Sequence, residues 1–347
     1  MTSYDSIIPC KNKQDFTINF FKLLLILGVV SIHSNVLVEI DKPVDNAGYM
    51  VVDFLASKLT FICVPCFFIL SGYLFFNNIT RFNMQVYKKK LRSRFYSLLL
   101  PYFLWNLIAL ALTIVKVLFF NYPSHGLIEN GHLSLLKLFE GFVDYTDGYP
   151  YAFAFWFIRN LIVFVITSPI VALVIRKRWG IILLIPLLLL DINLHGFEYF
   201  IMGGWFAAYY KELKVDGVSA VSSIAIWIGV AVLSEFIELD YWLAVKFVAV
   251  ICAFLGLLNL IRTHRYRLDN IYSRTLIAST FFIYAFHQLY CTVIRKSFEN
   301  LFGLESSSGI ILSYILSFLV LVGISFTLWL ICRRLFPTAT RLLGGNR

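Results

Sequence analysis

Charged residues are scarce in this sequence, and acidic residues are the scarcest. Only 14% of the 347 residues are charged, with 20 acidic side chains against 30 basic ones, while 59% are hydrophobic. About a quarter of a soluble domain is charged, so the composition excludes an ordinary soluble fold. It predicts an all-α, polytopic membrane protein, in which lipid covers the apolar helix faces.

Cysteines are also few, and their pattern argues against a disulfide framework. The six cysteines are scattered along the chain. Cys63 and Cys66 have the CxxC spacing of redox motifs, but they lie inside an apolar run without a strand-helix-strand pattern, so packing is the favoured interpretation. No small-residue cleavage site follows the first apolar run, which predicts a retained helix rather than a signal peptide.

Ten apolar segments divide the chain, and most of them fit a helix that crosses a membrane, which needs about 20 residues. They are residues 17–38, 50–76, 94–120, 153–175, 180–192, 196–210, 218–238, 241–261, 275–297 and 309–332. The fifth and sixth are short, and either span the membrane or form a tilted or re-entrant pair. No internal repeat supports the symmetry of an inverted-repeat transporter.

Basic residues predict the orientation of these segments. If both termini are cytoplasmic, the cytoplasmic segments hold 22 of the 30 Lys and Arg residues and the outer loops hold four. This positive-inside pattern explains the net charge without nucleic acid, which we do not expect as a partner. Residues 1–347 then form one transmembrane domain, with a cytoplasmic N-terminal segment (1–16), an external loop (about 121–152) and a cytoplasmic tail (333–347).

Two polar residues in the first span lie on one helix face. Lys22 and His33 are eleven residues apart, which is 20° more than three full turns and about 16 Å along the axis. Charged groups inside a membrane usually line the bundle interior or a water-filled cavity. The alternatives are a lysine that snorkels to the cytoplasmic surface and a histidine that packs between helices. Asn35 follows His33 closely and is a candidate substrate-binding residue.

The cytoplasmic end of the second span and the basic loop after it are candidates for binding a phosphorylated ligand. Ser71 and Gly72 allow a polar group to approach the backbone, although small residues also serve close helix packing. Arg92 and Arg94 belong to a cluster of Lys and Arg at the inner surface. Arginine suits phosphate, but topology signalling and contact with anionic lipid heads explain the same cluster.

The outer halves of two later spans contain further polar groups. Arg159 needs a partner inside the membrane, and Trp156 is either an interfacial aromatic residue or a wall of a sugar site. His287 lies at a depth similar to that of His33, with Tyr284 on a neighbouring helix face. Two histidines can ligate a metal, but no third ligand follows at a fitting spacing, so no metal is expected.

Together these residues resemble the acyltransferase-3 family of integral membrane acyltransferases over most of the chain. The resemblance rests on the pair Lys22 and His33 and on four stretches of sequence, which are FFILSGYLF, LLLPYFLW after a basic segment, FWFIRNL and YAFHQ. It implies a multi-pass protein of a bacterial inner membrane that transfers an acyl group, usually acetyl from cytoplasmic acetyl-CoA, to a hydroxyl of a surface, polymeric or lipid-linked glycan, as in O-acetylation of O-antigen.

The resemblance also implies roles for individual residues. His33 corresponds to the essential histidine and Lys22 to its basic partner, which is commonly Arg in the family. The family's Arg-x-x-Arg motif aligns best with Arg94 to Ser97, where the second arginine is missing and Arg92 is a candidate substitute. These departures leave the ligands of the CoA phosphates open at the level of single residues.

The chemistry fits these roles, because an imidazole titrates in the range that a general base needs. His33 is then expected to remove the proton of the attacking hydroxyl, with an oxyanion donor supplied by Arg159, a tyrosine or a backbone N–H. His287 is a candidate to orient the acceptor or to act as a second acid or base. A covalent acyl-enzyme through His33 or a serine stays open, as does a transporter whose polar residues line a substrate path.

Overall fold

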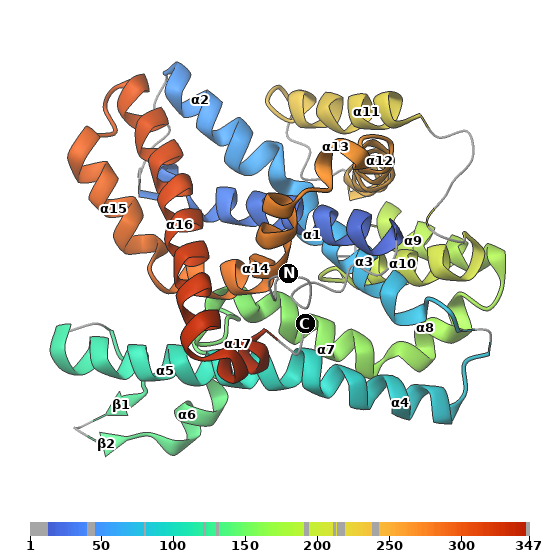
Figure 1. Cartoon of the computed structure of the whole chain (residues 1–347), viewed down its shortest axis with the longest axis horizontal. Coiled ribbons are helices and arrows are strands. Elements are labelled where there is room, and N and C mark those ends of the chain that lie inside the picture. The colour runs from blue at the N-terminus through green and yellow to red at the C-terminus, as the bar shows by residue number, and fades with distance from the viewer. Residues whose placement is uncertain are drawn as a thin grey trace, which may run out of the picture.

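The computed structural model of the 347-residue chain is almost entirely helical (Figure 1). It describes residues 13–39, 46–79, 81–120, 123–129, 132–190, 194–210, 213, 219–237 and 243–344. The helices are α1 (Lys13–His33), α2 (Ala47–Asp53), α3 (Cys63–Phe76), α4 (Met84–Arg94), α5 (Leu100–Phe120), α6 (Leu135–Glu140), α7 (Trp156–Ile166), α8 (Ser168–Val174), α9 (Leu184–Leu189), α10 (Phe197–Tyr209), α11 (Ala220–Leu233), α12 (Leu243–Thr263), α13 (Arg265–Leu268), α14 (Ile271–Phe286), α15 (Cys291–Phe302), α16 (Ser307–Leu335) and α17 (Pro337–Leu343). Two short strands, β1 (Ile128–Glu129) and β2 (His132–Leu133), form an antiparallel hairpin.

The polytopic membrane fold predicted from the composition is confirmed, and each of the ten apolar segments contains helix within the described residues. Five helical stretches are long and apolar enough to cross a membrane, and the number is up to seven if each of two bent pairs is one span. The remaining three segments hold the short helices α9, α10 and α11. The count of ten spans and the orientation of the termini therefore stay predictions.

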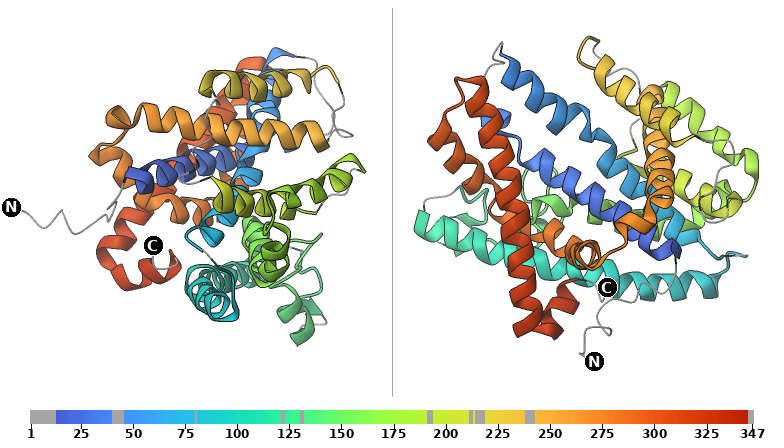
Figure 2. Two further views of the ribbon diagram at one scale, coloured as in Figure 1. Left: turned by 90° about the vertical axis from the view of Figure 1, so that its right-hand side faces the viewer. Right: turned by 45° about the horizontal axis from the view of Figure 1, so that its top comes forward.

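Helices from both ends of the chain surround α14 (Figure 1). Helix α14 packs against α1 and α16, while α15 lies beside α16 and α11 beside α12, in agreement with the views of Figure 2. Helices α4 and α5 run as one continuous helix along the lower edge of Figure 1. This arrangement brings the first span into contact with the last two.

Prolines explain irregular turns in two of the spans. Pro65 lies near the start of α3 and follows a 3₁₀ turn, η3 (Thr60–Ile62), which contains the residue four positions before it. A π-helical turn, η2 (Phe54–Lys58), lies farther upstream, beyond the reach of this proline. Pro101 lies near the start of α5 and follows a second π-helical turn, η4 (Phe95–Leu99). Proline lacks an N–H and clashes with the carbonyl four residues earlier, so the chain rearranges its hydrogen bonds just before each proline.

Two further spans are bent by 64°. Pro169 stands at the start of α8, where a proline is tolerated because the first helical N–H groups have no intrahelical partner, and α7 ends just before it. The break between α14 and α15 has no proline, and contains instead the 3₁₀ turn η9 (His287–Leu289). A 3₁₀ stretch within a span often marks a functional hinge, and this one begins with a histidine that sequence reasoning singled out.

Small residues allow helices to pack closely together. This packing explains two residues that were singled out in the sequence, Gly72 and Cys63. A Cβ atom added to Gly72 of α3 would lie 2.1 Å from the carbonyl oxygen of Phe200 in α10, and one added to Gly203 would lie 1.9 Å from the carbonyl oxygen of Ile69. Gly72 therefore serves helix packing, the alternative that its sequence context left open. Cys63 is likewise a packing residue, because it is buried and its Sγ would lie only 2.3 Å from a Cβ atom added to Gly28 in α1.

Candidate active site

The two histidines singled out in the sequence are in contact. His33 ends α1 and His287 begins the η9 turn after α14, and their ring centroids are 5.2 Å apart. The ring of Phe153 lies edge-on to His33, with centroids 6.0 Å apart. We call this part of the molecule the histidine end. Among the described residues no group of three or more metal-ligating side chains forms here or elsewhere.

The hydrogen bond of His287 determines its tautomer. Its Nδ1 lies 2.9 Å from the carbonyl oxygen of Ile283, and because a carbonyl only accepts, Nδ1 holds the proton and Nε2 has a lone pair. The side chain is fully buried, and Nε2 has no hydrogen-bond partner in the part of the chain that the structure describes. His287 thus presents a fixed, unused acceptor next to His33.

Helix α1 is continuous from Lys13 to His33, so the calculated geometry of Lys22 and His33 applies. Both are half-buried, and Lys22 donates a hydrogen bond of 3.2 Å to Asn19 Oδ1. Lys22 therefore lies on the His33 face, in the half of α1 farther from the histidine end. Near the start of α1, the guanidinium of Arg265 lies 5.9 Å from the ring of Phe16. We call the part of the molecule around the start of α1 the basic end.

Helices α1, α2 and α16 pack against one another at the histidine end. Ser31 and Tyr314 share a hydrogen bond of 2.5 Å between their hydroxyl groups, and Val36 and Val52 pack with Tyr314 in a small apolar cluster. Asn35 accepts a hydrogen bond of 2.9 Å from the backbone N–H of Leu37 through Oδ1. Its side chain thus shapes the turn that follows α1.

Tyr284, one of the predicted residues, connects α14 to the turn before α7. Tyr284 donates a hydrogen bond of 2.6 Å to the carbonyl oxygen of Ala154, in the short turn that also contains Phe153. Trp156 begins α7 two residues later, is half-buried and packs against the main core. The tyrosine therefore fixes the position of the aromatic ring that touches His33.

Arg159 holds the loop between α5 and α7, which is the loop predicted to be external. Its Nη1 donates hydrogen bonds of 2.6 Å and 2.7 Å to the carbonyl oxygens of Val143 and Gly148, and its Nε and Nη2 both face Asn160 Oδ1 at 3.3 Å. Nearby, the buried Asn106 accepts a hydrogen bond from the N–H of Ala152. The partner that an intramembrane arginine needs is therefore a set of carbonyl and amide oxygens rather than an acid.

The candidates for binding phosphate lie toward the other end of the molecule. Arg92 is exposed and Arg94 is half-buried, and both are in the last turn of α4. On the same helix, the Lys90 ammonium lies 5.7 Å from the ring of Phe75, which follows the half-buried Ser71 by one turn of α3. The structure thus joins the basic helix to the end of α3 and keeps both apart from the histidine contact.

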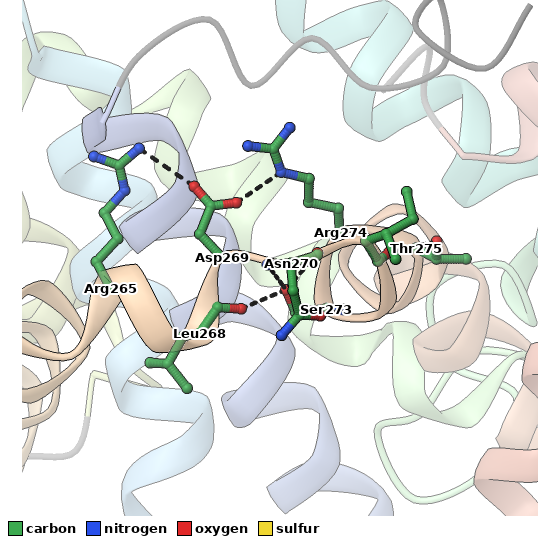
Figure 3. Close-up of polar contacts among 8 residues, drawn as sticks. Arg265, Leu268, Asp269, Asn270, Ser273, Arg274 and Thr275 are labelled. Carbon is green, nitrogen blue, oxygen red and sulfur yellow. Dashed lines mark hydrogen bonds and ion pairs between the residues drawn. The ribbon is translucent and has the colours of Figure 1, made fainter.

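An ion-pair cluster at the start of α14 was not predicted from the sequence (Figure 3). Asp269 accepts from Arg274 Nε at 2.6 Å and from Arg265 Nη2 at 3.4 Å. The hydrogen bond from Arg274 lowers the pKa of the Asp269 carboxyl. Asn270 and Ser273 form a capping box at the same helix start. Arg265 and Arg274 entered the sequence analysis only through the count of Lys and Arg residues, and Asp269 was not singled out.

Sequence reasoning also missed two neighbours of the histidines. Phe153 is an apolar residue in an apolar stretch, and Arg295 contributes to the sequence analysis only as one of the four basic residues counted on the outer side. Arg295 lies on α15 and interacts electrostatically with His33. Its eight-residue spacing from His287 is a weak signal, because the helix bends between them.

The fold and these contacts define a polytopic helical membrane protein whose first and penultimate predicted spans bring two imidazoles together. Residues 15–334 match the acyltransferase-3 family, described as an acyltransferase domain. Because this match covers most of the chain, the protein belongs to that family and is a membrane acyltransferase. Membership implies a transferase with an acyl donor and an acceptor, which leaves the transporter alternative without support. No curated protein and no solved structure matches the chain.

Proposed function

We propose that the protein transfers an acetyl group from cytoplasmic acetyl-CoA to a hydroxyl of a cell-surface or lipid-linked glycan, in a bacterial inner membrane. The observation that supports this most directly is the contact between His33 and His287, whose ring centroids are 5.2 Å apart. An imidazole pair at one end of α1, with a lysine on the same face toward the other end, suits a donor and an acceptor that arrive from opposite sides.

His33 acts as the general base of the transfer. It takes the proton of the glycan hydroxyl while that oxygen forms a bond to the acyl carbon of the thioester. The carbon–sulfur bond then breaks, and the CoA thiolate takes up the proton. His287 orients the acceptor, because its Nε2 has a free lone pair that accepts a hydrogen bond from a second sugar hydroxyl.

The donor enters at the basic end. Arg92 and Arg94 are accessible on α4 and bind the CoA phosphates, for which guanidinium groups are well suited. Ser71 and Lys22 lie farther in and contact the arm of CoA. Gly72 is left out of this site, because α10 occupies its open side. The span of about 16 Å between Lys22 and His33 accommodates the extended arm.

The acceptor binds under the external loop. Arg159 fixes the loop through the carbonyl groups of Val143 and Gly148, and Asn106 fixes its last residues. Arg159 is therefore proposed as a positioning residue of the acceptor site. Trp156, Tyr284 and Asn35 line the sugar-binding side of the histidine end, where aromatic rings suit the apolar faces of sugars.

Replacing His33 by Ala tests this function. Without the base, acetylation of the surface polysaccharide should fall by at least about 100-fold, because general base catalysis contributes about 100- to 10,000-fold. The measurement is NMR of O-acetyl signals in polysaccharide from cells that lack the gene and express either the wild type or the variant. The exposed His264 provides the control, and His264→Ala should retain wild-type acetylation. Normal O-acetylation by a stably expressed His33→Ala variant would contradict the proposal.

A further inference from the structure

A stripe of polar contacts on α16 faces the histidine end. Each helical residue turns 100°, so Tyr314, Ser317, Leu321 and Ser325 lie within about 80° of one another. Tyr314 holds α1 through Ser31. Toward the other end of the stripe, Tyr290 Oη bonds the carbonyl oxygen of Leu321 and Ser325 Oγ, each at 2.8 Å. Ser317 therefore lies between the contact with the His33 helix and the contact with the turn that follows His287.

The hydroxyl group of Ser317 has no hydrogen-bond partner among the described residues. The residue is fully buried, and its Oγ makes no hydrogen bond with any residue that the structure describes. Most other buried serines are satisfied. Ser34 and Ser279 donate to carbonyl oxygens one turn earlier in the chain, and Ser313 donates to the carbonyl oxygen of Phe298. Ser168, in α8, is the other fully buried serine of the described residues whose Oγ is unpaired. Serines in membrane helices commonly bond back to their own helix in this way, and Ser317 does not.

An unpaired polar atom is costly inside a membrane protein, because no water compensates for the lost hydrogen bond. Such an atom in a native structure needs an explanation, and ligand binding is one. Three fully buried residues of the described chain have such an atom, namely Ser168 in α8, His287 and Ser317, and of these only His287 and Ser317 lie on the elements that meet at the histidine end. Nε2 of His287 only accepts, whereas the hydroxyl of Ser317 can donate, so the two atoms are complementary to the two reactants, a sugar hydroxyl that donates and an acyl carbonyl oxygen that accepts.

The side chains predicted as donors for the acyl oxygen are engaged elsewhere. Arg159 donates to the external loop, Tyr284 donates to Ala154, and Tyr290 is bonded to α16. On this basis, and resting on the function proposed above, we propose that Ser317 donates a hydrogen bond to the carbonyl oxygen of the acyl thioester. That oxygen becomes negatively charged when the glycan hydroxyl attacks, and a donor placed for it stabilises the tetrahedral intermediate. Ser317 itself forms no covalent bond, and its proton stays on its oxygen.

Ser317→Ala is the test, with Ser279→Ala as a matched buried serine whose hydroxyl bonds its own helix. Purified proteins are assayed with radiolabelled acetyl-CoA and polysaccharide from cells that lack the gene. Ser317→Ala should lower kcat by about 100- to 1,000-fold with an unchanged KM for acetyl-CoA, and Ser279→Ala should leave both unchanged. The melting temperature of Ser317→Ala should equal or exceed that of the wild type, because the change removes an unsatisfied buried hydroxyl.

Several outcomes would overturn the role of Ser317. A kcat within about threefold of the wild type, a raised KM for acetyl-CoA with normal kcat, or a fall in kcat matched by loss of melting temperature would each do so. Mass spectrometry that finds Ser317 acetylated during turnover would replace the donor role by a covalent one. The wild type and His33→Ala, assayed in parallel, report on the proposed function itself, so failure of that function is distinguishable from failure of the Ser317 role.

Discussion

At the scale of single residues, the surroundings of each polar side chain decide what it can do. His287 has its proton fixed on Nδ1 by Ile283, so only Nε2 is left to accept a hydrogen bond. Arg159 looks like a catalytic cation in the sequence, yet its donors bind loop carbonyls. Asp269 lies among basic residues and is the acceptor that joins two of them.

The Asp269 cluster predicts a pH dependence of stability. Because Arg274 holds the pKa of Asp269 below its ordinary value, the cluster contributes its full stability above the ordinary carboxyl pKa of about 4. That contribution is lost as the pH falls through the lowered folded-state pKa. Asp269→Asn should therefore cost about 1 kcal/mol near pH 7, a modest value for partly exposed ion pairs.

Thermal unfolding in detergent checks this prediction. The melting temperature of Asp269→Asn should lie below that of the wild type near pH 7, and the gap should close once the pH is acidic enough to protonate Asp269. Asp147→Asn, a change at an exposed aspartate of the external loop, is the control. A gap that is the same at neutral and acidic pH would show that the carboxylate charge has no part in the effect.

At the scale of helices, packing depends on glycine at particular positions. Helices α3 and α10 approach so closely that a Cβ on Gly203 would lie 1.9 Å from the Ile69 carbonyl oxygen, whereas a Cβ on Gly229 in α11 would meet nothing within 4 Å. The irregular turns before Pro65 and Pro101 likewise set where each helix points. A few local features, namely close contacts at glycines and irregular turns, therefore set how the helices are positioned.

Gly203→Ala should destabilise the protein by about 1–3 kcal/mol or more, because the added methyl group pushes against backbone atoms that cannot rotate away. Gly229→Ala is the matched control and should be neutral or slightly stabilising, since alanine is the better helix former. Fluorescence-detected size-exclusion chromatography after stepwise heating measures both. Equal stability of the two variants would contradict the close approach of α3 and α10.

At the scale of the whole molecule, the ends of several helices gather around one contact. The last residue of α1, the turn before α7 and the bend after α14 meet at His33, and α16 holds them together. Basic residues gather at the opposite end, on α4 and between α12 and α14. The charge distribution of the sequence predicts that the basic end faces the cytoplasm.

Cysteine labelling tests this orientation. Leu136, which is 75% exposed in the external loop, and Lys89, which is exposed on α4, are each replaced by Cys. A membrane-impermeant maleimide added to intact spheroplasts should label Leu136→Cys and should label Lys89→Cys only after permeabilisation. The protein without either substitution measures labelling of its own cysteines. The reverse pattern would place the histidine end in the cytoplasm and overturn the proposed path of the donor.

Properties that depend only on residues close together in the sequence were predictable from the sequence. The apolar segments follow from composition, and the shared face of Lys22 and His33 follows from the helical repeat. The sequence also placed His33 and His287 at similar depth, but it did not predict that their rings touch. The break at η9 and the packing of α1 against α14 decide that contact. Neither feature is marked in the sequence by a signal as clear as a proline.

The sequence by itself determined the membrane class, the helical segments and the family motifs, because hydropathy and helical spacing act over short stretches of chain. Only the tertiary structure decided that Gly72 packs against α10, that Arg159 holds the loop before α7 and that the buried hydroxyl of Ser317 on α16 has no partner among the described residues. These facts depend on which atoms from distant parts of the chain come within a few ångströms, and the angles and breaks of the packed helices determine that.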